Sequence, residues 1–145
     1  MITIMNNKSH LILYYKGDIS ALMLFCQQAD GHICFPPLPK LSDILPENQH
    51  QPQEVNLHPA LLIKNINATL QLDDDLLVAD PGFYEQVDTP DGIVSVYLAR
   101  FKLLDPPHQI MAARHCKLQP LTALIGRPPA EMELLRRAYT SAMED

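Results

Sequence analysis

Residues 58–72 form the longest stretch in the middle of the chain with the pattern of an amphipathic helix. Pro59 fits the first turn, where the N–H that proline lacks would have no partner. Aliphatic residues recur at three- and four-residue spacing, which predicts one apolar face packed on a core. These residues are Leu62, Ile63, Ile66 and Leu70. The segment therefore predicts a helix that is buried along one side.

The polar side of this predicted helix carries no carboxylate. No Asp or Glu occurs between Glu54 and Asp73. Mg²⁺ takes oxygen ligands, and carboxylates are the usual protein donors, so this helix cannot hold Mg²⁺ by its own side chains. The sequence predicts no metal and no cofactor here.

Composition predicts one domain over residues 1–145, since 145 residues with 47% hydrophobic content suffice for a single core. The net charge of -6 comes from 17 acids and 11 bases without a charged block, so nucleic acid is not predicted as a partner. The longest apolar runs, 11–15 and 19–26, are far shorter than the roughly 20 residues that span a bilayer. No membrane partner and a cytoplasmic location are therefore expected.

The three cysteines, Cys26, Cys34 and Cys116, lack the spacing of a zinc site. Cys26 and Cys34 flank a predicted turn and could face each other across a hairpin. In a reducing compartment they would remain thiols. Buried thiols are the prediction for all three.

The N-terminal part predicts two hairpins. Apolar and β-branched residues at 11–15 and 19–27 flank Gly17, which suits a short hairpin loop. The second strand then turns at Asp30 and Gly31 and returns over 32–35. A continuous apolar run at 21–26 indicates a central strand covered on both faces.

Residues 36–56 are rich in proline and predict a long irregular connection over the surface. Such loops are uncommon in compact domains, so either a lid or binding loop or a mobile crossover is expected.

The C-terminal half predicts short strands and a final helix. Asp73, Asp74 and Asp75 predict a solvated turn. Thr89 to Gly92 carries a strong hairpin-turn signal because Asp-Gly supplies left-handed positions. The remaining predictions are strands at 76–79, 83–87, 93–101 and 115–118, a turn at 80–82, and a helix at 129–143 that buries Leu134 and Leu135.

This order of elements and the aliphatic pattern at 58–72 resemble the Nudix family. In that α+β family a mixed sheet is sandwiched between helices, and a strand-loop-helix segment carries the signature G-x5-E-x7-R-E-U-x-E-E-x-G-U, with U aliphatic. The resemblance covers roughly residues 19–143. Lys64 stands at the signature arginine, Ile66 at the first U and Leu72 at the final U.

The functional positions of that signature are not retained. The replacements are His50 and Gln71 for the two glycines, and Asn56, Asn65, Ala68 and Thr69 for the glutamates. In the family, these carboxylates hold Mg²⁺ or Mn²⁺ against a diphosphate, and one can activate the attacking water. The resemblance therefore implies a Nudix-like domain without the usual pyrophosphohydrolase activity.

Three hypotheses about function follow. The first is a non-hydrolytic domain that binds a small ligand, with nucleotides among the candidates, or a protein partner. Its predicted site comprises Phe35, Glu85, Tyr97 and Arg100. The structural alternative places Phe35 and Tyr97 in the core and makes Glu85 and Arg100 a cross-strand pair.

The second hypothesis is an active Nudix-type phosphohydrolase of nucleoside diphosphate derivatives that uses acids from elsewhere. Its candidates are Glu47, Glu54, Asp73 and Asp74. The third is a structural subunit, a homodimer formed through an exposed edge of the apolar N-terminal strands.

Overall fold

The computed structural model describes residues 9–18, 21–52 and 58–144, and it is an α+β domain built on one mixed sheet. The strands are β1 (Ser9–Lys16), β2 (Met23–Gln28), β3 (Cys34–Phe35), β4 (Asp43–Ile44), β5 (Leu77–Thr89), β6 (Gly92–Phe101) and β7 (Cys116–Gln119). The helices are α1 (Pro59–Leu70), α2 (His108–Ala112) and α3 (Pro129–Met143), with 3₁₀ turns at Glu47–Gln49 and Leu121–Leu124.

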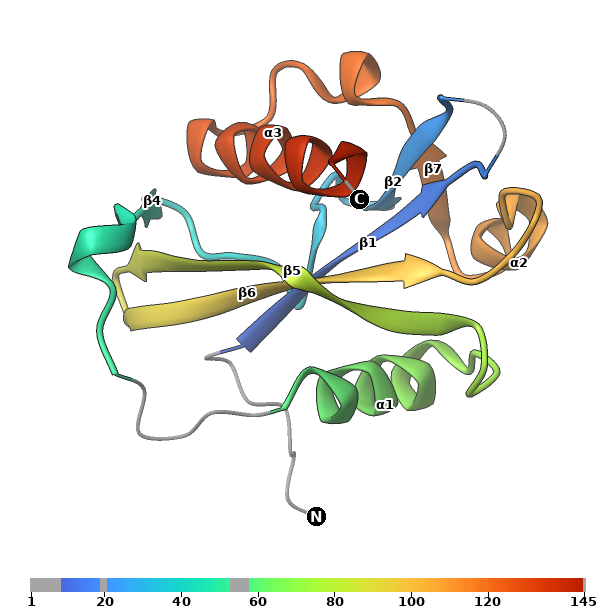
Figure 1. The fold of residues 1–145 in the computed structure, drawn as a ribbon, viewed down its shortest axis with the longest axis horizontal. Coiled ribbons are helices and arrows are strands. Elements are labelled where there is room, and N and C mark those ends of the chain that lie inside the picture. The colour runs from blue at the N-terminus through green and yellow to red at the C-terminus, as the bar shows by residue number, and fades with distance from the viewer. Residues whose placement is uncertain (1–8, 19–20, 53–57, 145) are drawn as a thin grey trace.

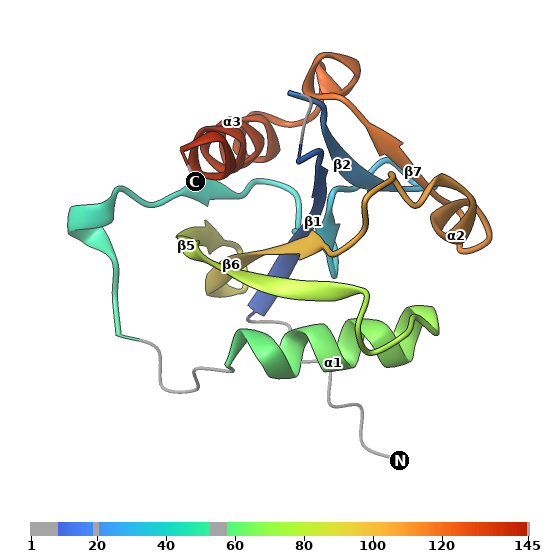
Figure 2. The same ribbon diagram turned by 45° about the vertical axis from the view of Figure 1, so that its right-hand side comes forward.

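The sheet has the strand order β4-β5-β6-β1-β2-β7, and β3 also pairs with β1. Strands β1 and β6 are parallel, and the remaining strand pairs are antiparallel. Strands β5 and β6 cross β1 and β2 at a steep angle, so the sheet is strongly curled (Figure 1). Figure 2 shows α1 on one side of the sheet and α3 on the other.

Strand β1 is buried on both faces, which explains its apolar sequence without alternation. Leu11, Leu13 and Tyr15 belong to the core cluster that contains the buried side of α1. Ile12 and Tyr14 belong to the second cluster, which contains the buried side of α3. The core thus consists of two apolar layers separated by the sheet.

Helix α1 confirms the prediction made for residues 58–72. The His58 Nδ1 atom accepts a hydrogen bond from the Ala60 N–H at the first turn. Gln71 then adopts a left-handed conformation, and the Leu72 N–H donates to the Asn67 carbonyl, which ends the helix. The buried residues are Leu62, Ile63, Ile66 and Asn67, with Leu70 half-buried.

Two predicted hairpins are confirmed, β1–β2 and β5–β6. Strand β2 begins at Met23, and Ala21 and Leu22 before it are exposed; residues 19 and 20 of the predicted strand lie outside the described residues. Gly92 has a φ of 119°, a left-handed conformation that favours glycine, and it pairs with Thr89 across the turn. Leu134 and Leu135 are fully buried on α3, as predicted.

The predicted second hairpin is wrong. Strand β3 pairs with β1 and not with β2, so both β2 and β3 run antiparallel to β1 along the same edge. Cys26 packs in the cluster around α1 and Cys34 in the cluster around α3, so these two cysteines do not face each other. The sequence shows the local turn at Gly31, but the choice of partner strand depends on tertiary packing.

Strand β5 differs from the prediction, because residues 77–89 form one strand in place of two strands and a turn. Its pairing with β6 is irregular between Asp80 and Tyr84, which indicates a bulge. The Asp80 carboxylate accepts a hydrogen bond from the Gly82 N–H within this bulge. Helix α2 was not predicted; it is a five-residue helix after two prolines, too short to show a periodic pattern.

The predicted connection at 36–56 is mostly irregular over its described part, 36–52, and includes the short strand β4. Strand β1 lies inside the sheet between β6 and β2, so the N-terminal hairpin does not offer the free edge expected for a homodimer. Among the described strands, β4 and β7 end the sheet and the two-residue β3 pairs only with β1, so a dimer formed by strand pairing would use one of these strands. None of the helices in the described part of the chain has the length and apolar character needed to cross a bilayer.

Replacing Ile66 by Asp tests the buried face of α1. Ile66 is 7% exposed, so an unpaired carboxylate there should lower the free energy of unfolding by about 3–5 kcal/mol. Leu61 lies on the same helix and is 49% exposed, so Leu61→Asp is the matched control and should change stability by less than about 1 kcal/mol. Urea denaturation followed by circular dichroism measures both; equal losses would show that the face is misassigned.

Candidate functional site

A hollow of about 400 Å³ lies beside the C-terminal half of α1, and we call it the α1 pocket. It lies among α1, the segments at 28–30 and 35–37, and the segment that leads into β7. Its apolar lining comprises Ala29, Phe35, Pro36, Pro37, Ile66 and Leu70. Its polar lining comprises Gln28, Asp30, Thr69, Arg114, His115 and Cys116. An apolar pocket with a few polar groups is the usual form of a small-molecule site.

Arg114 fixes one wall of the pocket against the end of α1. Its Nε donates to the Leu70 carbonyl at 2.9 Å, and its Nη2 donates to the Gln71 carbonyl at 2.8 Å. A cation is favourable at a helix C-terminus, where carbonyl groups lack helical partners. His115 follows with a φ of 61° and redirects the chain into β7.

The opposite wall is the excursion between β2 and β3. The Gln28 side chain donates to the Cys34 carbonyl at 2.7 Å, which ties the start of the excursion to its end. The Asp30 carboxylate accepts a hydrogen bond from the His32 N–H at 3.2 Å and shapes the turn. Both walls therefore rest on hydrogen bonds that involve backbone groups.

Cys116 is a wall residue with a perturbed pKa. A hydrogen bond from the Cys26 thiol lowers the pKa of Cys116 and raises that of Cys26, which is also buried. Burial raises the pKa of Cys34 on the other face of the sheet, and the nearby Glu131 adds to this effect. Cys116 is thus the thiol of the three whose ionisation is favoured.

The structure places one of the four predicted site residues, Phe35, in the α1 pocket. Tyr97 lies on the same face of the sheet, since both residues pair with Leu11 on β1. Its ring lies 5.4 Å from that of Tyr84, and burial raises the pKa of its hydroxyl. Tyr97 is not among the pocket-lining residues.

Glu85 and Arg100 lie apart from the pocket and from each other. Glu85 accepts a hydrogen bond from Arg137 of α3 at 2.8 Å, and Arg100 donates to Asp18 at 2.9 Å. Glu85 pairs with Val96 in the sheet, so the alternative of a Glu85–Arg100 cross-strand pair is wrong. The four residues therefore do not form one site.

Sequence reasoning missed Thr69, Arg114 and Cys116 as pocket residues. In the resemblance to the Nudix signature, Thr69 aligns with a glutamate, which was a usable signal. Arg114 and Cys116 come from a segment far along the chain, and only the pairing of β7 with β2 brings them to α1.

The alternative acids do not gather into a described cluster. Glu47 lies in the 3₁₀ turn, and Asp73 and Asp74 lie exposed in the turn after α1. Glu54 lies outside the described residues. Within residues 9–18, 21–52 and 58–144, no group of three or more His, Cys, Asp or Glu side chains is placed to hold a metal ion.

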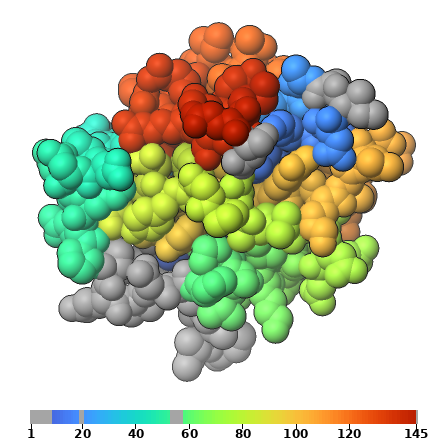
Figure 3. All heavy atoms as spheres, viewed as in Figure 1, coloured from blue at the N-terminus to red at the C-terminus, as the bar shows by residue number. Residues whose placement is uncertain are grey.

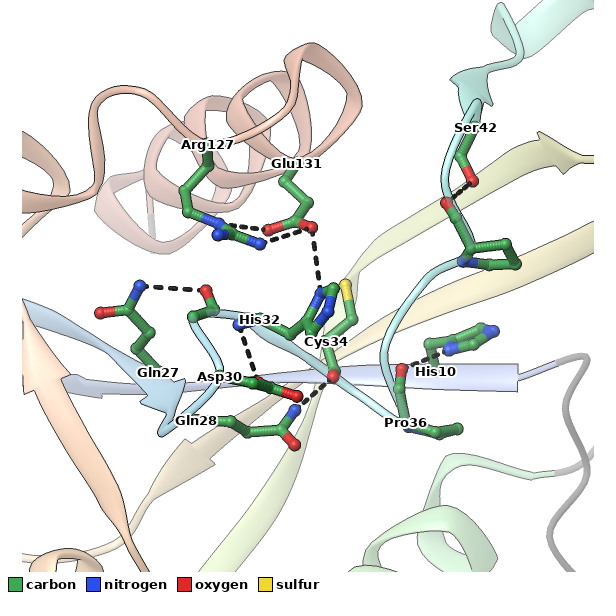
Figure 4. Close-up of polar contacts among 12 residues, drawn as sticks. His10, Gln27, Gln28, Asp30, His32, Cys34, Pro36, Ser42, Arg127 and Glu131 are labelled. Carbon is green, nitrogen blue, oxygen red and sulfur yellow. Dashed lines mark hydrogen bonds and ion pairs between the residues drawn. The ribbon is translucent and has the colours of Figure 1, made fainter.

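A second polar cluster, comprising His32, Arg127 and Glu131, lies under the start of α3 (Figure 4). The Arg127 guanidinium donates to both carboxylate oxygens of Glu131, at 3.0 and 3.1 Å. His32 Nδ1 lies 3.6 Å from the Glu131 carboxylate, and this contact is an ion pair when His32 is protonated. A Cβ on Gly31 would lie 2.8 Å from Arg127 Nη1, so the glycine permits this close approach.

This cluster joins the start of α3 to the excursion between β2 and β3 through the contact of His32 with Glu131. Glu131 is 4% exposed, and a bidentate pair with Arg127 satisfies its two oxygens. A hollow of about 420 Å³ adjoins it, lined by the segments at 38–43 and 128–131. The contacts of Glu131 are directed to residues of the chain, which favours a structural role.

Comparison with known proteins gives no assignment: no family model matches the sequence, and no curated protein matches it.

Replacing Glu131 by Gln tests this anchor. The substitution leaves the partly buried Arg127 without its counter-charge, so the free energy of unfolding should fall by about 2–4 kcal/mol. Glu133→Gln is the control on the same helix, because Glu133 forms ion pairs with Arg136 and Arg137 at the surface. This substitution should lower the free energy of unfolding by less than about 1 kcal/mol. Guanidinium denaturation compares the two, and similar losses would contradict the anchoring role.

Proposed function

We propose that this chain is a Nudix-like domain that binds a small, largely apolar ligand in the α1 pocket and does not hydrolyse diphosphates. The observation that carries the proposal is that Thr69, which stands at a signature glutamate position, lines this pocket. The helix that bears the catalytic acids in the family thus presents a neutral side chain to a ligand-sized hollow.

The conformation at the C-terminal end of α1 supports the alignment of this helix with the Nudix signature. Gln71 stands at the final signature glycine and has φ and ψ of 56° and 49°, a left-handed conformation that glycine adopts most readily. Ile66 and Leu72, at the two aliphatic positions, are both buried. The backbone therefore meets the steric demands of the signature although its glycine is absent.

The side chains at the glutamate positions support the lack of hydrolysis. Ala68 and Thr69 are exposed and Asn65 is half-buried, so these positions lie on the outer side of α1. Carboxylates there could grip one metal ion together, because residues one turn apart share a helix face. Amide, methyl and hydroxyl groups supply neither the charge nor the base that the family's reaction needs.

The arrangement of α1 and α3 further supports the Nudix-like assignment. Their apolar sides pack in separate clusters on the two faces of the mixed sheet. Figure 3 shows that β5 forms the surface between the two helices on one side of the molecule. The family's sandwich of a mixed sheet between helices has this order of layers.

The lining of the pocket favours a compact ligand with an apolar ring or aliphatic body. Phe35, Ile66 and Leu70 offer apolar contacts, and Gln28, Asp30 and His115 offer polar groups. A volume of about 400 Å³ lies within the range of small-molecule sites.

A ligand titration tests the pocket. We expect a compact aromatic or nucleoside-type compound from a screening panel to shift the amide resonances of residues 28–30, 66–70 and 114–116 in ¹⁵N-labelled protein. Thr69→Trp should fill the hollow and abolish these shifts, because an indole ring occupies much of the volume. Leu61→Trp, on the exposed side of the same helix, should leave them unchanged. Binding that survives Thr69→Trp, or shifts confined to another region, would contradict the assignment.

A phosphate-release screen tests the lack of hydrolysis. We expect no turnover above background for nucleoside diphosphate derivatives with Mg²⁺ or Mn²⁺, since loss of metal ligands and base removes several kcal/mol of transition-state stabilisation and each 1.4 kcal/mol is about tenfold in rate. The control is the double variant Glu54→Gln, Asp73→Asn. Turnover of about one per second that disappears in the double variant would favour the hydrolase alternative.

A further inference from the structure

Cys26 and Cys116 are brought together by the pairing of β2 with β7. Cys26 lies opposite Leu118, and Cys116 lies opposite Gln28. Residues two apart on a strand point to the same face, so the two cysteines are diagonal neighbours on one side of the sheet. Both belong to the core cluster that contains α1, whereas Cys34 belongs to the cluster on the other face.

The two thiols differ in reactivity. Cys116 is 4% exposed, and its thiol donates to the Arg114 carbonyl at 3.5 Å. Cys26 is fully buried, and a hydrogen bond from its thiol lowers the pKa of Cys116, although burial of Cys116 acts against this. A hydrogen bond of this kind stabilises the Cys116 thiolate, and the thiolate is the form that attacks a disulfide. Cys116 is therefore the first nucleophile, and Cys26 is placed to resolve a mixed disulfide.

Access to the pair leads through Cys116. This residue lines the α1 pocket and also a neighbouring hollow of about 430 Å³ bordered by Gln27 and Lys117. Cys26 lines neither hollow, so a small reagent meets Cys116 before it can reach Cys26. Cys116 is also the first residue of β7, an outer strand of four residues.

We propose that Cys26 and Cys116 form a reversible dithiol–disulfide pair that cross-links β7 to β2 at the wall of the α1 pocket. The oxidant is a low-molecular-weight disulfide, RS–SR. The Cys116 thiolate attacks one sulfur, a Cys116–SR bond forms, and RS⁻ leaves. The Cys26 thiol then loses its proton and attacks the Cys116 sulfur, which releases the second RS⁻. Two protein thiols are oxidised, and RS–SR is reduced to two RSH.

The cross-link stabilises the outer strand β7. Among the described strands, β7 pairs only with β2, through four residue pairs. A bond between residues 26 and 116 closes a long loop in the unfolded chain, and such a constraint raises stability by lowering the entropy of the unfolded state. Reduction by a dithiol restores both thiols and removes this constraint.

The test treats the folded, reduced chain with bis(2-hydroxyethyl) disulfide and follows intact mass and proteolytic peptides. We expect the mass to fall by two hydrogens with no retained reagent, and a peptide pair joined through Cys26 and Cys116. The melting temperature should rise by at least about 5 °C and return to its starting value with dithiothreitol.

Three serine variants complete the test. Cys34→Ser should still form the cross-link, whereas Cys26→Ser should stop at a mixed disulfide on Cys116. Cys116→Ser should retain no reagent, because Cys26 is buried behind it. An unmodified wild-type chain, a stable mixed disulfide on wild-type Cys116, or a bond that involves Cys34 would each overturn the proposal. The wild-type measurements stand even where a variant fails to fold.

Discussion

The parallel pairing of β1 with β6 is the constraint on which the rest of the structure depends. The pair runs from Ser9 opposite Ser95 to Tyr14 opposite Arg100, in the middle of the sheet. Buried parallel strands need a covering layer on both faces, because their side chains are apolar on both. Helix α1 covers one face and α3 the other, so removing either layer would expose the same two strands.

The α1 pocket is a consequence of how the covering layer ends. Helix α1 stops at Leu70, and the sheet beyond it is covered by the excursion after β2 and by the segment before β7. These three pieces meet without filling the space between them. Arg114 holds the junction together through the terminal carbonyls of α1, so the hollow persists as part of the folded architecture.

The two faces of the sheet carry different polar chemistry. On the α3 side, the buried Glu131 forms an ion pair with Arg127, four residues before it, and His32 of the β2–β3 excursion lies 3.6 Å from the same carboxylate. On the α1 side, Cys26 and Cys116 belong to one core cluster, and Cys116 lines the α1 pocket. Internal pairing favours a structural role for the first group, and access from the hollow favours a reactive role for the second.

The sequence by itself determined α1, α3, the β5–β6 hairpin and the buried character of β1 and β2, because periodicity, proline placement and the Asp-Gly turn act over a few residues. It also determined that α1 carries no acid. Only the tertiary structure decided that β3 pairs with β1 and that Cys26 lies beside Cys116 and not beside Cys34. It also decided that Phe35 lies in the α1 pocket, apart from Glu85 and Arg100. Strand partners far apart in the chain are selected by burial and register over the whole sheet, and no local pattern encodes that choice.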